Sequence, residues 1–246
     1  VKKGEVFGFL GPNGAGKSTT IRHLMGFIQA DQGSCQINGL DCLRDHARIQ
    51  QALGYLPGEI AFMDDMTGLE FIKFMAKMKG MTDLTKAYEL MERFELNPQG
   101  KIKKMSKGMK QKIGIICAFM HDPELLILDE PSSGLDPLMQ NRFIELVLEE
   151  KQRGKTIFMS SHIFEEIERT CDRTAMIKDG RLISIEELQT LKASKHKTYQ
   201  ITFATQELVE QFMDEGFECK QVESNVIKVV PRNNLNYLLA TLSRYD

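Results

Sequence analysis

The stretch that decides the fold is Val6-Phe7-Gly8-Phe9-Leu10 followed directly by Gly11-Pro12-Asn13-Gly14-Ala15-Gly16-Lys17-Ser18-Thr19. The apolar residues 6–10 predict a buried strand, and the run after them satisfies the pattern G-x-x-x-x-G-K-[ST] at every fixed position. From Lys17 to about Phe27 we expect a helix. A glycine-rich turn without a ligand is the alternative. Strand, loop and helix in this order are the context in which the pattern binds phosphate, so the sequence predicts a nucleoside triphosphate site.

The residue types of this loop suit a polyanion. Glycines at 11, 14 and 16 allow backbone N–H groups to approach phosphate closely. Lys17 places a positive charge at the β- and γ-phosphates, Ser18 offers a hydroxyl to Mg²⁺, and the helix dipole adds to the field. The predicted ATP-binding set in this loop is Gly11, Pro12, Asn13, Gly14, Ala15, Gly16, Lys17, Ser18 and Thr19.

A second apolar run, Leu125-Leu126-Ile127-Leu128, ends in Asp129 and Glu130. A buried strand that ends in Asp places this carboxylate where it can hold Mg²⁺ opposite the loop, with Ser18 as the other metal ligand. Glu130 is then a candidate for orienting and polarising the attacking water. Two carboxylates after an apolar run are weak evidence alone. Together with the loop they predict binding and hydrolysis of a nucleoside triphosphate.

Composition limits the remaining classes. The chain has 246 residues, 42% of them hydrophobic and 27% charged, which suits one large domain with or without a small one. The formal net charge of −2 gives no indication of a nucleic-acid partner. No apolar stretch approaches the ~18 residues of a membrane span. Five cysteines without a C-x-x-C pair predict reduced thiols, not disulfides or a zinc site.

Periodicity predicts how the rest of the chain is organised. Residues 67–97 have helical spacing, with an apolar stripe that we expect to be mainly packing. Further helices are predicted at residues 107–120, 138–153 and 164–170, and strands at 156–160 and 174–177. Residues 193–197 are a candidate polar linker, followed by a small β-α-β-α module in which residues 218–230 form one or two strands.

Three more motifs follow in order: Met105-Ser106-Lys107-Gly108-Met109-Lys110-Gln111-Lys112, Ser133-Gly134-Leu135-Asp136 and Ser160-Ser161-His162. With residues 11–19 as Walker A and 125–130 as Walker B, residues 1–185 resemble the nucleotide-binding subunit of an ATP-binding-cassette (ABC) transporter. The resemblance implies an α/β P-loop NTPase of the ABC type, with a mixed sheet, a helical subdomain at about 60–120 and a small α+β C-terminal module. Together with the change in sequence character near residue 190, it gives the expected domains as residues 1–190 and 197–246.

The resemblance also implies roles for individual residues. Glu130 would be the general base, His162 would contact the γ-phosphate, and Lys17 would complete the catalytic set. Ser106 and Gly108 would reach across a dimer to the ATP held by the other subunit. Asp136 would couple the two sites, and the cofactors would be ATP and Mg²⁺.

The chain departs from the family pattern at several points. Gly58 stands where a Gln is usual, so Glu59, backbone or water would have to replace that side chain. Lys107 and Met109 replace the usual Gly and Gln of the signature. The start without Met, so close to the loop, suggests truncation, and the adenine-stacking aromatic would lie upstream. We expect Phe7 and Phe9 to be core residues.

The resulting expectation is an ATPase subunit peripheral to the cytoplasmic face of the membrane. It would power export through a separate transmembrane permease subunit and act as a homodimer or an ABC heterodimer, without nucleic acid. The partner would dock on residues 67–97 beside Gly58 and Glu59. Two alternatives stay open: a non-transport ABC ATPase that acts on ribosomes or DNA, and a nucleotide-binding regulatory subunit of low activity.

Overall fold

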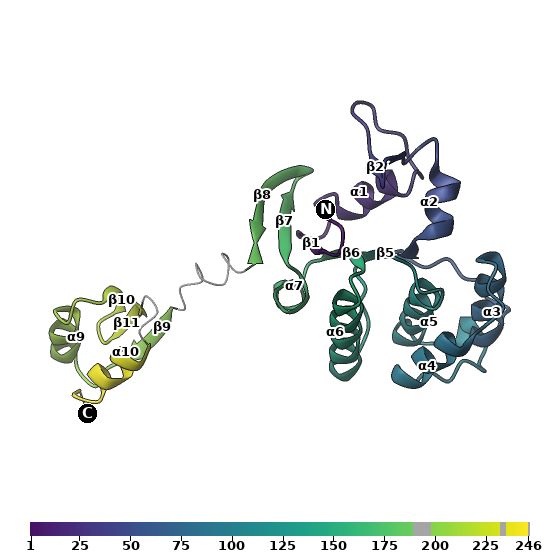
Figure 1. The fold of residues 1–246 in the computed structure, drawn as a ribbon. Helices are drawn as coiled ribbons and strands as arrows, with labels where there is room; N and C mark the ends of the chain where they lie inside the picture. Colours follow the sequence, from purple (N-terminus) through teal and green to yellow (C-terminus); the bar gives the residue numbers. More distant parts are fainter. Residues whose placement is uncertain (189–197, 232–234, 246) are drawn as a thin grey trace. The chain divides into compact units, whose positions relative to one another are not determined.

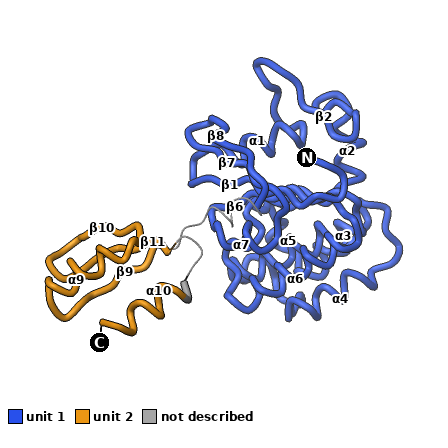
Figure 2. Tube along the Cα trace, turned by 60° about the vertical axis from the view of Figure 1, so that its left-hand side comes forward, with its two compact units in different colours: residues 1–188 blue, residues 189–246 orange. Residues whose placement is uncertain are grey.

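The computed structural model describes residues 1–188, 198–231 and 235–245. The chain divides into two compact units, residues 1–188 and 189–246 (Figures 1 and 2). The predicted linker at residues 193–197 lies outside the described residues. Each unit has a hydrophobic core of its own.

A six-stranded sheet organises the first unit (Figure 1). Its strands, in spatial order, are β4 (Gly54–Leu56), β5 (Leu125–Asp129), β6 (Thr156–Ser161), β1 (Val6–Leu10), β7 (Arg173–Lys178) and β8 (Arg181–Glu187). Neighbouring strands from β4 to β7 are parallel, and β8 runs antiparallel to β7. The sheet is therefore mixed, as the family resemblance implied.

The central strands carry their aromatic residues into the core. Phe7 and Phe9 are 7% and 6% exposed, and both lie against Phe158 of β6, with ring centroids 6.0 and 5.6 Å apart. Their prediction as core residues is confirmed. Because the strands are parallel, their carboxyl ends meet at one edge, and this edge is where ligands bind in open α/β sheets.

Helix α1 (Lys17–Leu24) follows the glycine loop but ends before the predicted Phe27. Gly26 has a φ of +69°, and the Phe27 N–H donates to the Arg22 carbonyl at 2.9 Å. This is a Schellman ending, which stops the helix because glycine adopts the left-handed conformation without strain. The chain continues through β2 (Gln36–Ile37), β3 (Leu40–Asp41) and α2 (His46–Ala52).

The helical subdomain differs from the sequence prediction. The pattern at residues 67–97 forms two helices, α3 (Gly68–Met78) and α4 (Thr85–Arg93). Thr67 and Glu70 form a capping box that starts α3, and Gly80, with a φ of +70°, follows its end. Part of the apolar stripe is not packing, because Met78 and Tyr88 are 64% and 50% exposed. The short η1 (Ile102–Lys104) and α5 (Lys107–Phe119) complete the subdomain beside α3 and α4 (Figure 1).

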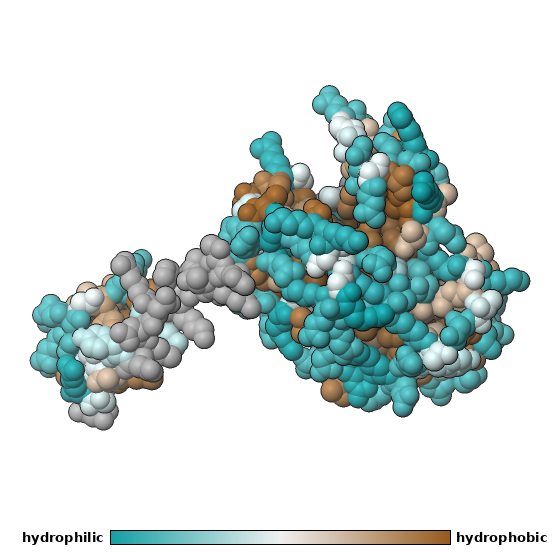
Figure 3. Space-filling view, in the orientation of Figure 1, coloured by the Kyte–Doolittle hydropathy of each residue, from teal (hydrophilic) through white to brown (hydrophobic). Residues whose placement is uncertain are grey.

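Two more helices pack on the sheet: α6 (Pro137–Gln152) and α7 (Phe164–Thr170). The other edge of the sheet is apolar on its surface. Leu182, Ile183 and Ile185 of β8 are all at least half exposed, and Figure 3 shows the apolar surface over this strand. Among the described residues, no helix has the length and apolarity needed to cross a membrane.

The second unit has the elements β9 (Tyr199–Thr202), α9 (Gln206–Met213), β10 (Glu218–Glu223), β11 (Val226–Val230) and α10 (Leu235–Leu242). Its three strands form an antiparallel sheet in the order β10-β11-β9. Residues 218–230 thus form two strands, and the unit is β-α-β-β-α. Val209, Phe212 and Ile227 lie at the centre of its core and are fully buried.

Candidate ATP-binding and hydrolysis site

The glycine loop lies at the carboxyl edge of the sheet, between β1 and α1 (Figure 1). Gly16 has a φ of +106°, a backbone conformation that side chains rarely allow, and it delivers Lys17 as the first residue of α1. A Cβ at Gly11 would overlap the carbonyl oxygen of Ile177, so only glycine fits against β7. The loop conformation therefore depends on glycine at both of these positions.

Lys17 is only 5% exposed, and its ammonium has three close oxygen neighbours. Its Nζ lies 2.8 Å from the Gly11 carbonyl, 3.1 Å from the Pro12 carbonyl and 3.0 Å from Oε1 of Glu130. A buried cation is stable only when it is paired. Glu130 supplies the negative charge that a bound phosphate would otherwise bring.

Glu130 has an unusual backbone for a residue with a side chain. Its φ is +48°, in the left-handed region, which costs about 1 kcal/mol outside glycine. Its N–H donates to the Ser160 hydroxyl at 3.0 Å, and the Gln111 amide donates to the Pro131 carbonyl at 2.8 Å. These contacts hold the strained turn, which directs the carboxylate back to Lys17.

His162 completes a row of three charged or ionisable groups. Its Nδ1 donates to Oε2 of Glu130 at 3.0 Å, and its side chain is 44% exposed. The structure thus brings together all three residues predicted to be catalytic. Glu130 is held from both sides, by Lys17 and by His162.

Asp129 is 3% exposed and accepts a hydrogen bond from the Ser160 hydroxyl through Oδ1. Its Oδ2 faces Gly58, where a Cβ would lie 3.0 Å away. The glycine at this unusual position therefore leaves the carboxylate uncrowded. Ser18, Asp129 and Glu130 line one hollow of about 660 Å³, and their hydroxyl and carboxylate oxygens are the donors that Mg²⁺ prefers.

The same hollow extends to the helical subdomain. Its further lining includes Tyr55, Glu59, Phe71, Met75 and Cys117. Burial raises the pKa of Tyr55 and of Cys117 to about 12, so both side chains stay neutral at physiological pH. The negative charge at this wall of the hollow therefore comes from carboxylates.

A second group of predicted residues lies elsewhere, at two helix N-termini. Ser106 caps α5 and accepts from the Met109 N–H at 3.2 Å, and Asp136 caps α6 in the same way. The loop before Asp136 packs on the start of α5, because a Cβ at Gly108 would be 2.7 Å from the Gly134 carbonyl. Ser106, Gly108 and Asp136 are thus assembled with one another, in contacts separate from those of residues 11–19.

Lys107, which replaces a glycine of the family signature, takes part in this assembly. Its Nζ donates to the Ser133 hydroxyl at 2.9 Å. Its side-chain carbons also lie against Gly134, where a Cβ would be 2.9 Å away. The substitution therefore ties the signature segment to the loop at residues 133–136.

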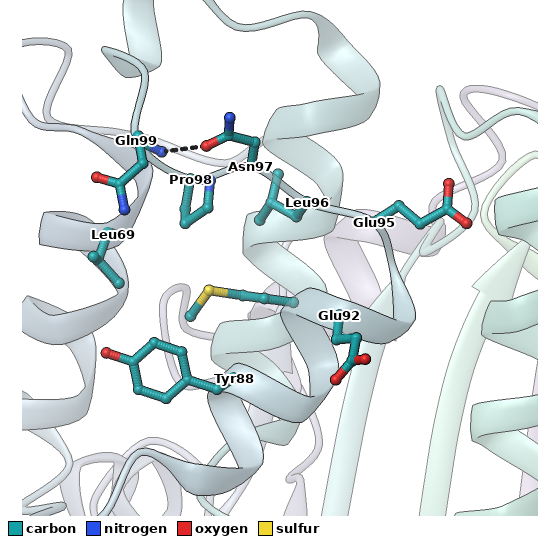
Figure 4. A pocket seen from close by; sticks show the side chains of 9 residues that line it. Leu69, Tyr88, Glu92, Glu95, Leu96, Asn97, Pro98 and Gln99 are labelled. Atoms are coloured by element: carbon teal, nitrogen blue, oxygen red, sulfur yellow. Dashed lines mark hydrogen bonds between the residues drawn. The ribbon is translucent and has the colours of Figure 1, made fainter.

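A shallower hollow of about 490 Å³ lies on the helical subdomain (Figure 4). Leu69, Tyr88 and Pro98 surround it, and Glu92 and Glu95 lie along the α4 side. The N–H of Gln99 donates to the Asn97 side chain at 3.2 Å and closes the turn at its rim. Its lining is mainly apolar.

Sequence reasoning did not identify the supports of Glu130. Ser160 was noted as part of a motif, but its bonds to both carboxylate-bearing residues were not foreseen. Strand register explains these bonds, because the parallel pairing of β5 and β6 places Asp129 opposite Ser160. Gln111 belongs to the signature segment on α5, and its contact with the turn at residues 130–131 cannot be predicted from that motif.

Comparison with known proteins identifies the family of this chain. The family model described as ABC transporter matches residues 1–133. The linearmycin resistance ATP-binding protein LnrL of Bacillus subtilis (strain 168) is 42% identical over 190 residues, which are 75% of this chain and 61% of that protein. A solved ATP-binding subunit of an ABC transporter has a TM-score of 0.71 and 31% identity, over 88% of this chain and 85% of that chain.

The fold is also shared with the ATP-binding cassette MJ0796, a dimer in a post-hydrolysis state bound to ADP and Pi. Its TM-score is 0.70 at 22% identity, over 76% of this chain and 87% of that chain. The fold and the site define a P-loop ATPase. More narrowly, the chain belongs to the ABC transporter family and carries the ATP-binding, ATPase-type domain of that family.

Proposed function

We propose that this chain hydrolyses ATP to drive export through a separate membrane-spanning permease, to which it binds at the cytoplasmic face. The observation that carries the proposal is the row formed by Lys17, Glu130 and His162 beside the glycine loop. Hydrolysis of ATP uses a cation that binds phosphate and a carboxylate that activates water. Here the imidazole of His162 lies beside that carboxylate.

ATP binding would rearrange the contacts of Lys17. Residues 11–19 would cradle the phosphates through backbone N–H groups, and the Lys17 ammonium would exchange Glu130 for the β- and γ-phosphates. Glu130 would then be free to accept a proton from the attacking water. His162 would contact the γ-phosphate while its Nδ1 keeps Glu130 in place. The ion pair with Lys17 therefore keeps the base occupied until nucleotide arrives.

Ser18 and Asp129 would hold Mg²⁺ in the hollow that they share. The metal would neutralise charge on the β- and γ-phosphate oxygens. Asp129 keeps its position because Ser160 occupies Oδ1, which leaves Oδ2 for the metal side. Gly58 lets this oxygen reach the hollow without a competing side chain.

Two copies of this chain, or one copy and a related ABC chain, would enclose two ATP molecules. Ser106 and Gly108 would reach the nucleotide held by the other copy, and Asp136 would couple the two sites. The separation of this group from its own glycine loop supports the idea, as does the dimeric cassette of the same fold. A helix N-terminus at Ser106 would present positive dipole to the γ-phosphate.

The permease would dock beside the hollow of about 660 Å³, where Met75 of α3 offers partly exposed apolar surface above the buried Phe71. A helix of the partner with an apolar face would fit there. Export is supported by the relative named for linearmycin resistance. The substrate would be selected by the permease.

The decisive experiment is affinity purification of the tagged protein from detergent-solubilised membranes, with and without ATP. A stoichiometric protein with several membrane spans among the co-purified partners would support the proposal. Co-purification of ribosomes alone would support the non-transport alternative. Equal ATPase rates for the wild type and Glu130→Gln would instead support a nucleotide-binding regulatory subunit.

A further inference from the structure

A buried carboxylate lies next to the ATP site without belonging to it. Glu166, in the first turn of α7, is 4% exposed, and its Oε2 accepts from the Ser161 hydroxyl at 2.6 Å. Its Oε1 has no hydrogen-bond partner among the described residues. Burying a carboxyl oxygen without a partner is costly, so a residue kept there calls for an explanation. Burial also raises the pKa of Glu166.

The partner of Glu166 controls the turn that carries His162. Ser161 is the last residue of β6, and its hydroxyl accepts from the Ile163 N–H at 2.9 Å. A hydroxyl has a single proton to donate, and Glu166 at 2.6 Å is a closer acceptor than the Ile163 carbonyl at 3.3 Å. The lone pairs then remain directed at Ile163. The carboxyl group thus fixes the orientation in which the hydroxyl closes the turn at residues 161–163.

The turn at residues 161–163 also determines where the His162 imidazole lies. His162 lies between the two residues that the Ser161 hydroxyl joins, and its Nδ1 is 3.0 Å from Oε2 of Glu130. Its side chain is 44% exposed, so packing alone restrains it weakly. Its restraints are therefore the hydrogen bond to Glu130 and the turn of the backbone that carries it.

Glu166 also lines a hollow of about 240 Å³, together with Ser132, Gln140 and Asn141. Arg169 also lines this hollow, but its guanidinium donates to the Asn141 side chain at 2.8 Å. Ser132 immediately precedes the loop that ends in Asp136. Glu166 thus lies between the segment that carries His162 and the segment that carries Asp136.

We propose that Glu166 is a positioning residue which, through the Ser161 hydroxyl, holds His162 against Glu130 and so supports the rate of ATP hydrolysis. This inference rests on the proposed ATPase function. Glu166 is absent from the hollow that contains Ser18, Asp129 and Glu130, so its role is exerted through Ser161. ATP binding should accordingly depend on it much less than turnover does.

The test compares four variants in steady-state ATPase assays with full-length protein. Glu166→Met removes the acceptor, Ser161→Ala removes the hydroxyl, and Glu166→Gln keeps an acceptor of the same shape. Glu165→Met is the matched control, because Glu165 is next to Glu166 on α7 but is exposed. We expect Glu166→Met and Ser161→Ala each to lower kcat about tenfold, with KM for ATP changed less than about twofold, because small misplacements of a reacting group are costly.

A conservative variant and a double variant distinguish a positioning role of Glu166 from a purely structural one. Glu166→Gln should retain kcat within about threefold of the wild type, because it still accepts from Ser161. The double variant Ser161→Ala/Glu166→Met should be no slower than the slower single variant, since both break one link. Thermal unfolding of each variant shows whether a lower rate merely follows a lower folded fraction.

Wild-type kcat in Glu166→Met, equal losses in Glu166→Gln and Glu166→Met, or losses fully explained by unfolding would each overturn the inference. If Glu166→Met does not fold, Ser161→Ala and Glu166→Gln still decide it, since the inference predicts opposite results for them. A wild type without ATPase activity would instead refute the proposed function, which keeps the two failures distinguishable.

Discussion

The predicted site residues form two groups that differ in how far a single chain completes them. Glu130 and His162 directly follow the neighbouring strands β5 and β6, and Lys17 begins α1 after the glycine loop that follows β1. Contacts of 3.0 Å join the three side chains into one row. Ser106, Gly108 and Asp136 lie at the N-termini of α5 and α6. We call the first set the hydrolytic group and the second the signature group.

The difference follows from secondary structure. Parallel strands bring their carboxyl ends to one edge, so a sheet assembles side chains that are far apart in the sequence. A helix N-terminus instead presents N–H groups outward, away from its own body. The hydrolytic group therefore satisfies its charges internally, while the signature group presents donors to something outside it. In the proposed dimer that partner is ATP on the other copy.

The largest effect should come from the hydrolytic group. Glu130→Gln removes the base, and we expect kcat to fall about 10³-fold while ATP binding survives. The ATP-bound dimer should then accumulate, because hydrolysis no longer separates it. ATPase assays and light scattering with ATP and with ADP measure both effects. A variant that stays monomeric with ATP would show that the signature group does not meet nucleotide across a dimer.

A smaller loss is expected from the signature group. Ser106→Arg should lower kcat about 10²-fold, the weight of a lost donor at a transition state, and should prevent ATP-dependent dimerisation. Ser106→Thr is the matched control, since threonine also caps a helix. Nucleotide binding by the Ser106→Arg monomer should change little, because its own glycine loop is intact.

Mixing two inactive variants sharpens this test. Lys17→Ala disables the glycine loop but keeps Ser106, and Ser106→Arg does the reverse. A mixed dimer contains one site with both elements intact, so the mixture should regain activity that neither variant has alone. No recovery, with mixed dimers present, would mean that each chain completes its own site.

How much of this could be predicted from the sequence differs between the two groups. The loop and Asp129-Glu130 are continuous patterns beside an apolar strand, and both their elements and their proximity follow from parallel-strand rules. The contact of Lys17 with Glu130 was not foreseen, since the prediction assigned Lys17 to phosphate. Ser160 and Glu166 were missed as supports because their roles depend on strand register and on burial, which arise only in the folded chain.

The helical subdomain shows a different limit. Apolar spacing continues from Phe71 to Phe94, so periodicity alone predicted one helical region. The break at residues 79–84 depends on Gly80, whose positive φ ends α3, and a single glycine within a helical pattern is an ambiguous signal. The exposure of Met78 and Tyr88 follows from the packing of two separate helices, and spacing does not reveal it.

Gly58 allows a test of the metal part of the hydrolytic group. In Gly58→Ala the new Cβ would lie 3.0 Å from Oδ2 of Asp129, so the carboxylate must shift slightly. We expect the Mg²⁺ concentration for half-maximal ATPase activity to rise about threefold, less than the ~10–100-fold typical when an outer partner of a metal ligand is lost. Gly100→Ala is the control, because its nearest neighbour would be 3.8 Å away. An unchanged Mg²⁺ requirement would argue against Asp129 as a ligand.

The effect on activity should be smallest at the contact between the end of α5 and the chain just before β4. His121 follows α5, which begins at the signature group, and its Nε2 donates to the Leu53 carbonyl at 3.2 Å, just before β4. Lys79 of the segment after α3 donates to the same carbonyl at 2.9 Å. Burial, reinforced by the charge of Lys79, lowers the pKa of His121 from 6.5 to about 4.

The lowered pKa of His121 makes the folded protein less stable at acidic pH. Between pH 6.5 and about 4, the unfolded chain holds a proton on His121 that the folded chain does not bind. Stability is therefore complete above pH 6.5 and falls as the pH is lowered toward 4. After allowance for partial exposure, the contribution is about 1 kcal/mol. His121→Gln should remove this contribution to the loss of stability at low pH, and it should leave ATPase activity at pH 7.5 unchanged.

Urea unfolding at pH 7.5 and at pH 5 measures the effect, with His46→Gln on the exposed start of α2 as the matched histidine control. The difference in unfolding free energy between the two pH values should shrink in His121→Gln and not in His46→Gln. An equal difference in unfolding free energy between the two pH values in both variants would show that protonation of His121 does not affect stability. A loss of ATPase activity in His121→Gln at pH 7.5, with stability unchanged, would contradict the expectation that this contact serves stability alone.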